Sequence, residues 1–234
     1  MDDHRSRDVL DPVLHAIADA RHYNDWLFSR AQPYLGRSVL DVGAGIGTFT
    51  ERAADAGAEV TALEPEFGTL LRERLGGRPA VSVLEQPLET LEGSGEFDSI
   101  LCFNVLEHVA DDEQALRLLR NQLRPDGRLL LLVPAHRFLY GGFDHAAGHV
   151  RRYDRAPLRA LLEHAGFGVE QLRHVNPVGA LGWLARVRLR RSGEWPAASF
   201  RTFDRLVPVL RHLDRLRLPF GLSLWAVARR PRTG

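Results

Sequence analysis

The sequence predicts an α/β protein built on a doubly wound sheet, and two observations carry that prediction. Segments typical of buried strands alternate with segments of helical periodicity along most of the 234 residues, which indicates a largely parallel sheet covered by helices on both faces. A glycine-rich turn, VLDVGAGIG, joins the first expected strand to the helix after it, and ligands of such sheets bind at turns of this kind.

Seven strands are expected, each bounded by turn residues or by the start of a helix. They are Ser38–Val42, Glu59–Glu64, Ala80–Gln86, Phe97–Asn104, Gly127–Pro134, Phe167–Val175 and Leu222–Arg230. Helices are expected at Asp11–Tyr34, Thr48–Ala56, Phe67–Leu75, Asp111–Leu123, Ala156–Ala165, Asn176–Arg191 and Phe200–Leu216. The tetrapeptide Arg124–Gly127 is expected to be a turn.

Composition excludes several classes of site. The net charge is +1, so nothing draws the chain as a whole towards nucleic acid or an acidic membrane. The single cysteine, Cys102, rules out a disulfide framework and a cysteine-based metal site. The chain contains no lysine, which excludes a Schiff-base lysine and the lysine of a P-loop.

The N-terminus and the hydropathy pattern bear on location. The first ten residues, MDDHRSRDVL, are charged and lack the apolar stretch of a signal peptide. No apolar run approaches the ~20 residues that span a bilayer. We therefore expect a cytoplasmic protein without stable membrane insertion.

The glycine turn is paired with an acidic residue at the end of the second strand. Gly43, Gly45 and Gly47 allow a close approach of the backbone to a ligand, and Glu64 can accept both hydroxyls of a ribose. A dinucleotide fingerprint needs another glycine at position 48, which is Thr48. This spacing suits the amino-acid end of S-adenosylmethionine better than a diphosphate.

The motifs VLDVGAGIG, ALEP, FDSILCFNVLEHV and LRPDGRLLLLVP, in this order, resemble those of the class I S-adenosylmethionine-dependent methyltransferases. The resemblance covers about residues 37–134 and implies a Rossmann-like sheet of strand order 3-2-1-4-5-7-6, with strand 7 antiparallel. By this resemblance, one methyltransferase domain occupies residues 1–234. It comprises an N-terminal helical lid (1–36), the cofactor-binding core (37–175), a helical insert between strands 6 and 7 (176–220), and the last strand and tail (221–234).

The resemblance also implies which residues face S-adenosylmethionine and, after transfer, S-adenosylhomocysteine. They are Tyr23, Asp41, Gly43, Ala44, Gly45, Gly47, Glu64, Pro65, Gln86, Leu88, Asn104 and His108. Gln86 departs from the family, which usually has an acidic residue there for the adenine. Tyr23 has an alternative role as an aromatic residue that packs the first helix on the sheet, and His108 has one as a helix cap.

The polar segment LYGGFDHAAGHVRRYDR, residues 139–155, follows the fifth strand and is expected at the mouth of the acceptor site. His136, Asp144, His145 and His149 are residue types that bind metals, but their spacing matches no standard cluster. We therefore predict no metal site. A nucleic-acid patch would need broader positive charge, and a plain solvated loop stays open. We favour an acceptor wall in which His145 or His149 is the base and Asp144 or an arginine orients it.

The predicted function is methyl transfer to a small-molecule acceptor, such as a secondary metabolite or a related biosynthetic intermediate. Two alternatives stay open at this point, a non-catalytic S-adenosylmethionine-binding partner of another enzyme and an NAD-dependent oxidoreductase. The insert carries a basic amphipathic face and several aromatic residues, so it is expected to cap the acceptor pocket or to mediate a homodimer or a membrane-surface contact. The acceptor and the atom that receives the methyl group are not specified by the sequence.

Overall fold

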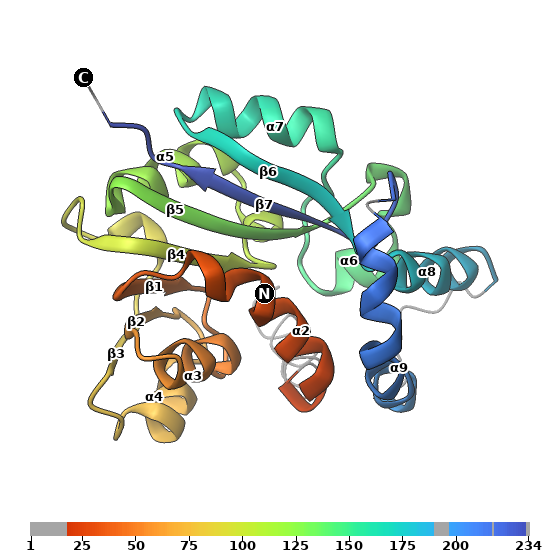
Figure 1. Cartoon of the computed structure of the whole chain (residues 1–234), viewed down its shortest axis with the longest axis horizontal. Coiled ribbons are helices and arrows are strands. Elements are labelled where there is room, and N and C mark those ends of the chain that lie inside the picture. Colours follow the sequence, from red (N-terminus) through yellow and green to blue (C-terminus); the bar gives the residue numbers. More distant parts are fainter. Residues whose placement is uncertain (1–17, 190–196, 217, 233–234) are drawn as a thin grey trace.

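A computed structural model of the chain describes residues 18–189, 197–216 and 218–232, and shows one seven-stranded sheet (Figure 1). The strands are β1 (Ser38–Val42), β2 (Glu59–Leu63), β3 (Val81–Leu84), β4 (Phe97–Phe103), β5 (Leu123–Pro134), β6 (Gly168–Val175) and β7 (Ser223–Arg229). Their spatial order is β3-β2-β1-β4-β5-β7-β6, and only β7 runs antiparallel to its neighbours β5 and β6. The expected fold class and strand order are therefore confirmed.

Helices cover both faces of this sheet (Figure 1). The α-helices are α2 (Arg21–Ala31), α3 (Thr48–Asp55), α4 (Gly68–Leu75), α5 (Asp112–Gln122), α6 (Gly142–Ala146), α7 (Arg155–His164), α8 (Pro177–Leu189) and α9 (Ala197–Leu210). Short 3-10 turns are η1 (Gln32–Tyr34), η2 (Leu88–Thr90), η3 (Leu106–His108), η4 (Arg137–Leu139) and η5 (Arg211–Leu216). Asp111 caps α5 by accepting the amide of Gln114 at 2.9 Å, which fixes where that helix begins.

The central strand β4 contributes to two hydrophobic cores because its side chains alternate between the faces of the sheet. Ile100 and Cys102 pack with the residues of α5 and α7, whereas Leu101 and Phe103 pack with those of α2 and α3. Burial of one large aliphatic side chain stabilises a fold by about 1.5–3 kcal/mol, so both layers hold the strand in place. This burial fixes the carboxyl end of β4, where Asn104 follows.

Strand β5 starts four residues before the expected Gly127, and the predicted turn lies inside it as an irregularity. Phe97 of β4 is paired with Leu123, but Ser99 is already paired with Arg128, so β5 carries extra residues at this point. Asp126 has a φ of +66°, which gives the backbone the bend that the sequence signal indicated. The chain turns there without leaving the sheet.

The described residues between β6 and β7 include the helices α8 and α9 and the turn η5, and α9 packs on α2. Asp204 of α9 accepts the backbone amide of Tyr23 at 2.8 Å and lies 2.9 Å from Nδ1 of His22. The rings of Tyr23 and Phe203 are 6.0 Å apart in an edge-on arrangement. The insert is therefore attached to the N-terminal helix, and both lie beside the carboxyl end of the sheet (Figure 1).

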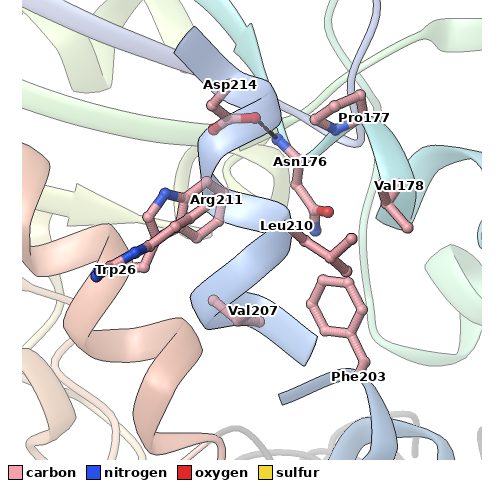
Figure 2. Close-up of a pocket in the computed structure, with 9 residues that line it drawn as sticks. All are labelled: Trp26, Asn176, Pro177, Val178, Phe203, Val207, Leu210, Arg211 and Asp214. Atoms are coloured by element: carbon pink, nitrogen blue, oxygen red, sulfur yellow. Dashed lines mark hydrogen bonds between the residues drawn. The ribbon is translucent and has the colours of Figure 1, made fainter. Parts of the chain in front are cut away.

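A small cavity lies where α2, α9 and the end of β6 meet. Its lining includes Trp26, Asn176, Phe203, Val207 and Asp214. The backbone amide of Asn176 donates to the carboxylate of Asp214 at 3.1 Å (Figure 2). The space holds about one water molecule, so it is part of the packing of the insert and too small for an acceptor. Among the described residues, no helix is both long enough and apolar enough to cross a membrane.

Candidate functional site

The glycine turn after β1 has a conformation that only glycine adopts readily. The φ angles of Gly43, Gly45 and Gly47 are +64°, +55° and +84°, in the left-handed region. A Cβ on Gly43 would lie 2.4 Å from a methyl group of Val105, the residue after Asn104. The turn is thus packed directly against the segment that follows β4.

Glu64 is buried behind the turn, with 5% of its surface exposed. One oxygen accepts the amide of Gly45 at 2.7 Å, and the other accepts the amides of Glu66 and Phe67 at 2.9 and 3.2 Å. A carboxylate has about four acceptor positions, so three backbone amides fix the group and one position stays available for a hydroxyl. A ribose hydroxyl at this edge of the sheet can donate a hydrogen bond to that position.

Asp41, near the end of β1, is also buried. It accepts the hydroxyl of Thr50 at 2.6 Å, and that contact ties the strand to α3. Burial, with a smaller contribution from the nearby Glu64 charge, raises the pKa of Asp41 to about 7 in spite of the bond from Thr50. A second ionised carboxylate beside Glu64 is therefore disfavoured, and Asp41 acts on the shape of the turn.

Three other predicted cofactor residues lie at the same edge of the sheet. Pro65 is exposed and follows β2, while Leu88 begins η2 and packs against the core. The side-chain amide nitrogen of Gln86 donates to the carbonyl of Thr90 at 3.1 Å, a bond that does not use its side-chain oxygen. The carboxyl ends of parallel strands meet at one edge, so these residues border the same space as the glycine turn.

No described contact links Tyr23 to the predicted cofactor residues around the glycine turn. Its ring packs 5.5 Å from Trp26 and beside Phe203, and its hydroxyl is hydrogen-bonded to Asn176. Burial raises the pKa of Tyr23 to about 12. These contacts match the packing role that was the alternative for this residue, and its contact with the cofactor stays a prediction.

Asn104 and His108 lie after β4. Asn104 is exposed, has a φ of +54°, and donates its amide to Leu132 of β5 at 2.8 Å. His108 ends η3, and its ring stands edge-on to that of His149, with centroids 4.8 Å apart. Burial and the neighbouring His149 lower the pKa of His108 to about 4, so its imidazole is neutral at physiological pH.

The segment after β5 is ordered around one buried carboxylate. Asp144, in the short helix α6, accepts Nε of Arg152 at 2.8 Å and Nδ1 of His149 at 2.9 Å on the same oxygen, and the amide of Gly141 at 2.9 Å on the other. Burial alone would raise the pKa of Asp144, but the bonds from His149 and Arg152 outweigh it and the pKa is lowered. The carboxylate is therefore charged and orients His149.

His145, the other candidate base of the predicted acceptor wall, and His136, which was weighed only as a metal ligand, lie elsewhere. His145 is exposed on α6 and makes no described side-chain contact with Asp144 or His149. His136 stacks on His174 of β6, with centroids 4.9 Å apart and planes at 7°. The structure thus brings together His149 and Asp144, and it leaves His136 and His145 apart from them.

Glu107 is the site residue that the sequence analysis missed. It lies in η3 beside His108, is fully buried, and neither carboxylate oxygen has a hydrogen-bond partner outside its own residue in the described structure. Burial raises its pKa to about 8. Ligand atoms of Glu107, His108 and His149 lie within 4.8 Å of one another, although 41 positions separate His108 from His149.

The insert contacts this segment through Trp183 of α8. The indole nitrogen donates to the carbonyl of Leu139 at 3.2 Å, and the ring stands edge-on to Phe143 at 5.2 Å. The guanidinium of Arg152 lies over the same ring, 4.5 Å from its centroid. The position of α8 is therefore coupled to the group that holds Asp144.

A family model described as a methyltransferase domain matches residues 4–172. The chain belongs to this family. The resemblance to class I S-adenosylmethionine-dependent methyltransferases is confirmed, and S-adenosylmethionine is the cofactor of the class. The turn, the buried Glu64 and the neighbouring Asn104 fit that cofactor, with a backbone cradle for the amino acid and a carboxylate for the ribose.

Similar proteins are known from sequence and from structure. A ubiquinone biosynthesis O-methyltransferase from Bordetella avium is 36% identical over 119 residues, which cover 49% of this chain and 48% of the relative. The chain thus spans about half the length of the curated relatives it matches.

Among solved structures, a 1,6-didemethyltoxoflavin-N1-methyltransferase from Burkholderia thailandensis, with S-adenosylhomocysteine bound, has a TM-score of 0.60 and 21% identity. The match covers 98% of this chain and 90% of that one. A [4+2]-cyclase, SpnF, also has a TM-score of 0.60, with 20% identity, and covers 90% of this chain and 81% of that one. At these identities the structural likeness shows the fold alone, and the reaction has to be argued from the site.

Proposed function

We propose that this protein transfers a methyl group from S-adenosylmethionine to a hydroxyl oxygen of a small-molecule acceptor. The observation that carries the proposal is the cluster of Glu107, His108 and His149 beside the carboxyl end of β4. It adjoins the glycine turn through the contact of Val105 with Gly43. Relatives matched along about half of their length are named ubiquinone biosynthesis O-methyltransferases, which supports oxygen as the receiving atom.

The chemistry needs alignment and removal of one proton. The bound cofactor supplies a methyl group on a sulfonium; the protein holds the acceptor in line with it and excludes water. As the new carbon–oxygen bond forms and the carbon–sulfur bond breaks, the hydroxyl proton must leave. The cluster of Glu107, His108 and His149 lies where that proton would depart, and Asp144 fixes the orientation of His149.

The acceptor is proposed to enter between α6 and the insert. The contacts of Trp183 with Leu139 and Phe143 support this route, because they make α8 a wall of the same region as His149. The exposed apolar side chains of Phe138 and Val150 lie on the segment that would border the entrance. An acceptor with both an apolar body and a hydroxyl, such as a biosynthetic phenol or a related intermediate, matches these surroundings.

The cofactor half of the proposal is tested by calorimetric titration with S-adenosylhomocysteine and, in parallel, with NAD. We expect S-adenosylhomocysteine to bind and Glu64→Ala to weaken it at least about 10-fold, as expected when a buried hydrogen bond to a charged group is lost. Glu73→Ala, on the exposed side of α4, is the matched control. Binding of NAD in place of S-adenosylhomocysteine would refute the proposal.

The acceptor half is tested with a panel of hydroxylated and amino-substituted small molecules, by release of S-adenosylhomocysteine. The expected result is turnover of hydroxyl compounds to products heavier by one CH₂ unit, because a methyl group replaces the hydroxyl hydrogen. If only amines were methylated, the choice of oxygen would be wrong. A cofactor that binds but is never turned over with any acceptor would favour the non-catalytic alternative.

A further inference from the structure

Glu107 is an unexplained feature of this fold. It is completely buried, and no hydrogen-bond donor beyond its own residue reaches either carboxylate oxygen among the described parts of the chain. Buried polar groups are nearly always hydrogen-bonded, and an unpaired buried carboxylate is costly. A structural role for Glu107 does not account for this arrangement, because an apolar residue would fill the same volume at no such cost.

Two imidazoles face this carboxylate. His108 is the next residue in η3, and His149 comes from the segment after α6, with the two rings 4.8 Å apart. One potential ligand atom from each of the three side chains lies within 4.8 Å of the others. Ligand atoms of one tetrahedral ion with bonds of about 2.0–2.2 Å lie roughly 3.3–3.6 Å apart. The separations in this cluster are at most 4.8 Å, so a closure of about 1 Å lets the three side chains share one ion.

The residues around the cluster hold the imidazoles as metal-bound histidines are held. Nδ1 of His149 is engaged by Asp144, so its other ring nitrogen is available. A ring nitrogen of His108 is hydrogen-bonded to the backbone of Gly148. Histidines that ligate metals commonly use their second nitrogen to bond a carboxylate or a backbone carbonyl, which fixes the ring.

The backbone ties the two halves of the cluster together. The amide of Val150 donates to the carbonyl of Glu107 at 2.8 Å, and the hydroxyl of Tyr153 donates to the carbonyl of Leu106 at 3.2 Å. Arg152 bonds the same oxygen of Asp144 as His149 does, at 2.8 Å. The backbone segments that carry the three side chains are thus held by contacts that do not involve the acceptor.

We propose that Glu107, His108 and His149 bind one divalent metal ion of the Zn²⁺ type, and that the ion holds an oxygen of the acceptor. Two imidazoles and one carboxylate form a set that suits Zn²⁺ or a related first-row ion and leaves a position open. This assignment rests on the proposed function for its role, since an ion there would favour loss of the proton of a bound hydroxyl. With this assignment His149 is a metal ligand, whereas the sequence analysis made it one of two candidate bases. The assignment also replaces the prediction that the protein has no metal site.

The experiment uses the full chain without a histidine tag, after treatment with a chelator. Co²⁺ is titrated and followed by its visible absorption, and Zn²⁺ is then added as a competitor, with metal content measured per chain by mass spectrometry. We expect one Co²⁺ per chain, displaced by one Zn²⁺. Neither the cofactor nor an acceptor is present, so metal binding and methyl transfer can fail separately.

The variants make the test specific. Glu107→Gln, which keeps the shape of the side chain, and His149→Ala are expected to abolish the Co²⁺ absorption, and Asp144→Asn to weaken binding 10–100-fold, as loss of an orienting partner does. His164→Ala removes an exposed histidine on α7 and is the control. Thermal unfolding and S-adenosylhomocysteine binding establish that each variant is folded; if His149→Ala is not, Glu107→Gln decides alone. Absence of stoichiometric Co²⁺ in the unaltered protein, or equal binding by Glu107→Gln, would overturn the proposal.

Discussion

Arg152 and Asp144 form an ion pair inside the protein, with Nε of the arginine 2.8 Å from Oδ1 of the aspartate and both side chains at most 2% exposed. Removal of Arg152 leaves the buried Asp144 with only His149 and Gly141 as partners, and breaking a buried ion pair in this way costs about 3–5 kcal/mol. We therefore expect Arg152→Met to lower the free energy of unfolding by that amount. Urea denaturation of the variant measures it.

The double variant Asp144→Asn with Arg152→Met removes both charges and is expected to recover part of the loss. Arg137→Met, on the exposed η4 turn of the same segment, is the control for the loss of one arginine. If both single arginine variants lost the same small amount, the ion pair would not be what holds α6.

The packing of Gly43 against Val105 predicts a steric effect on cofactor binding. In Gly43→Ala, the new methyl group would lie 2.4 Å from a methyl of Val105, in addition to the cost of a positive φ. Gly57→Ala is the matched control, since Gly57 has a φ of +93° with open space around it, and it pays only the conformational cost of about 1 kcal/mol.

We expect the free energy of unfolding of Gly43→Ala, measured by urea titration, to fall below that of Gly57→Ala. We also expect Gly43→Ala to bind S-adenosylhomocysteine more weakly, measured by calorimetric titration. Adding Val105→Ala should restore part of the stability, because it removes the overlapping methyl group. Equal losses in Gly43→Ala and Gly57→Ala, with unchanged affinity, would mean that the contact with Val105 does not shape the turn.

Asp41 predicts a dependence of stability on pH. Its pKa is about 7 in the folded protein because of burial, against a usual value of 3.8. Between these pH values the folded state keeps the proton that the unfolded chain releases, so this group stabilises the fold at low pH and loses that contribution as pH rises through about 7. In Asp41→Asn the side chain at position 41 does not ionise, so its contribution to stability does not change with pH.

The free energy of unfolding of Asp41→Asn should therefore rise relative to that of the unaltered protein as pH rises across this window, by an amount on the order of a few kcal/mol. Urea denaturation on both sides of the window measures the difference. Asp19→Asn, at an exposed position, corrects for the general effect of removing a carboxylate. Parallel stability curves for Asp41→Asn and the unaltered chain would contradict the assigned pKa.

The sequence was sufficient for the sheet and for the cofactor turn because both are encoded locally. The sequence pattern predicted β1 at Ser38–Val42 with the bounds observed. It also put Glu64 at the end of the second strand, where the structure has it accept the amide of Gly45. The proposed acceptor site could not be predicted in this way. His149 meets His108 only through the fold, and nothing in the linear spacing marks Glu107 as buried without a partner.

The burial of Arg152 illustrates the same limit. Among the arginines of RRYDR, sequence gave no reason to select the one that packs between Asp144 and Trp183. The short helix α6 was also missed, because its two flanking glycines indicate a loop and five residues give too little periodicity. Tertiary contacts decided both features.

Trp183 is the contact through which the insert acts on the segment after β5. Its indole donates to Leu139 and its ring packs on Phe143 and Arg152. We expect Trp183→Leu to speed amide hydrogen exchange in residues 137–150 about 10-fold, since the loss of these contacts lowers the free energy of local opening by about 1.4 kcal/mol. Trp183→Phe, which keeps a ring and loses only the donor, should give a smaller effect.

Affinity for S-adenosylhomocysteine should not change in either variant, because both substitutions alter the packing of α8 on Leu139 and Phe143, in the segment after β5. Leu181→Ala, exposed on the same helix, is the control and should leave exchange unaltered. Under the proposed function, the Michaelis constant for the acceptor rises in Trp183→Leu while that for the cofactor is kept. A change confined to the cofactor would show that α8 borders the other half of the site.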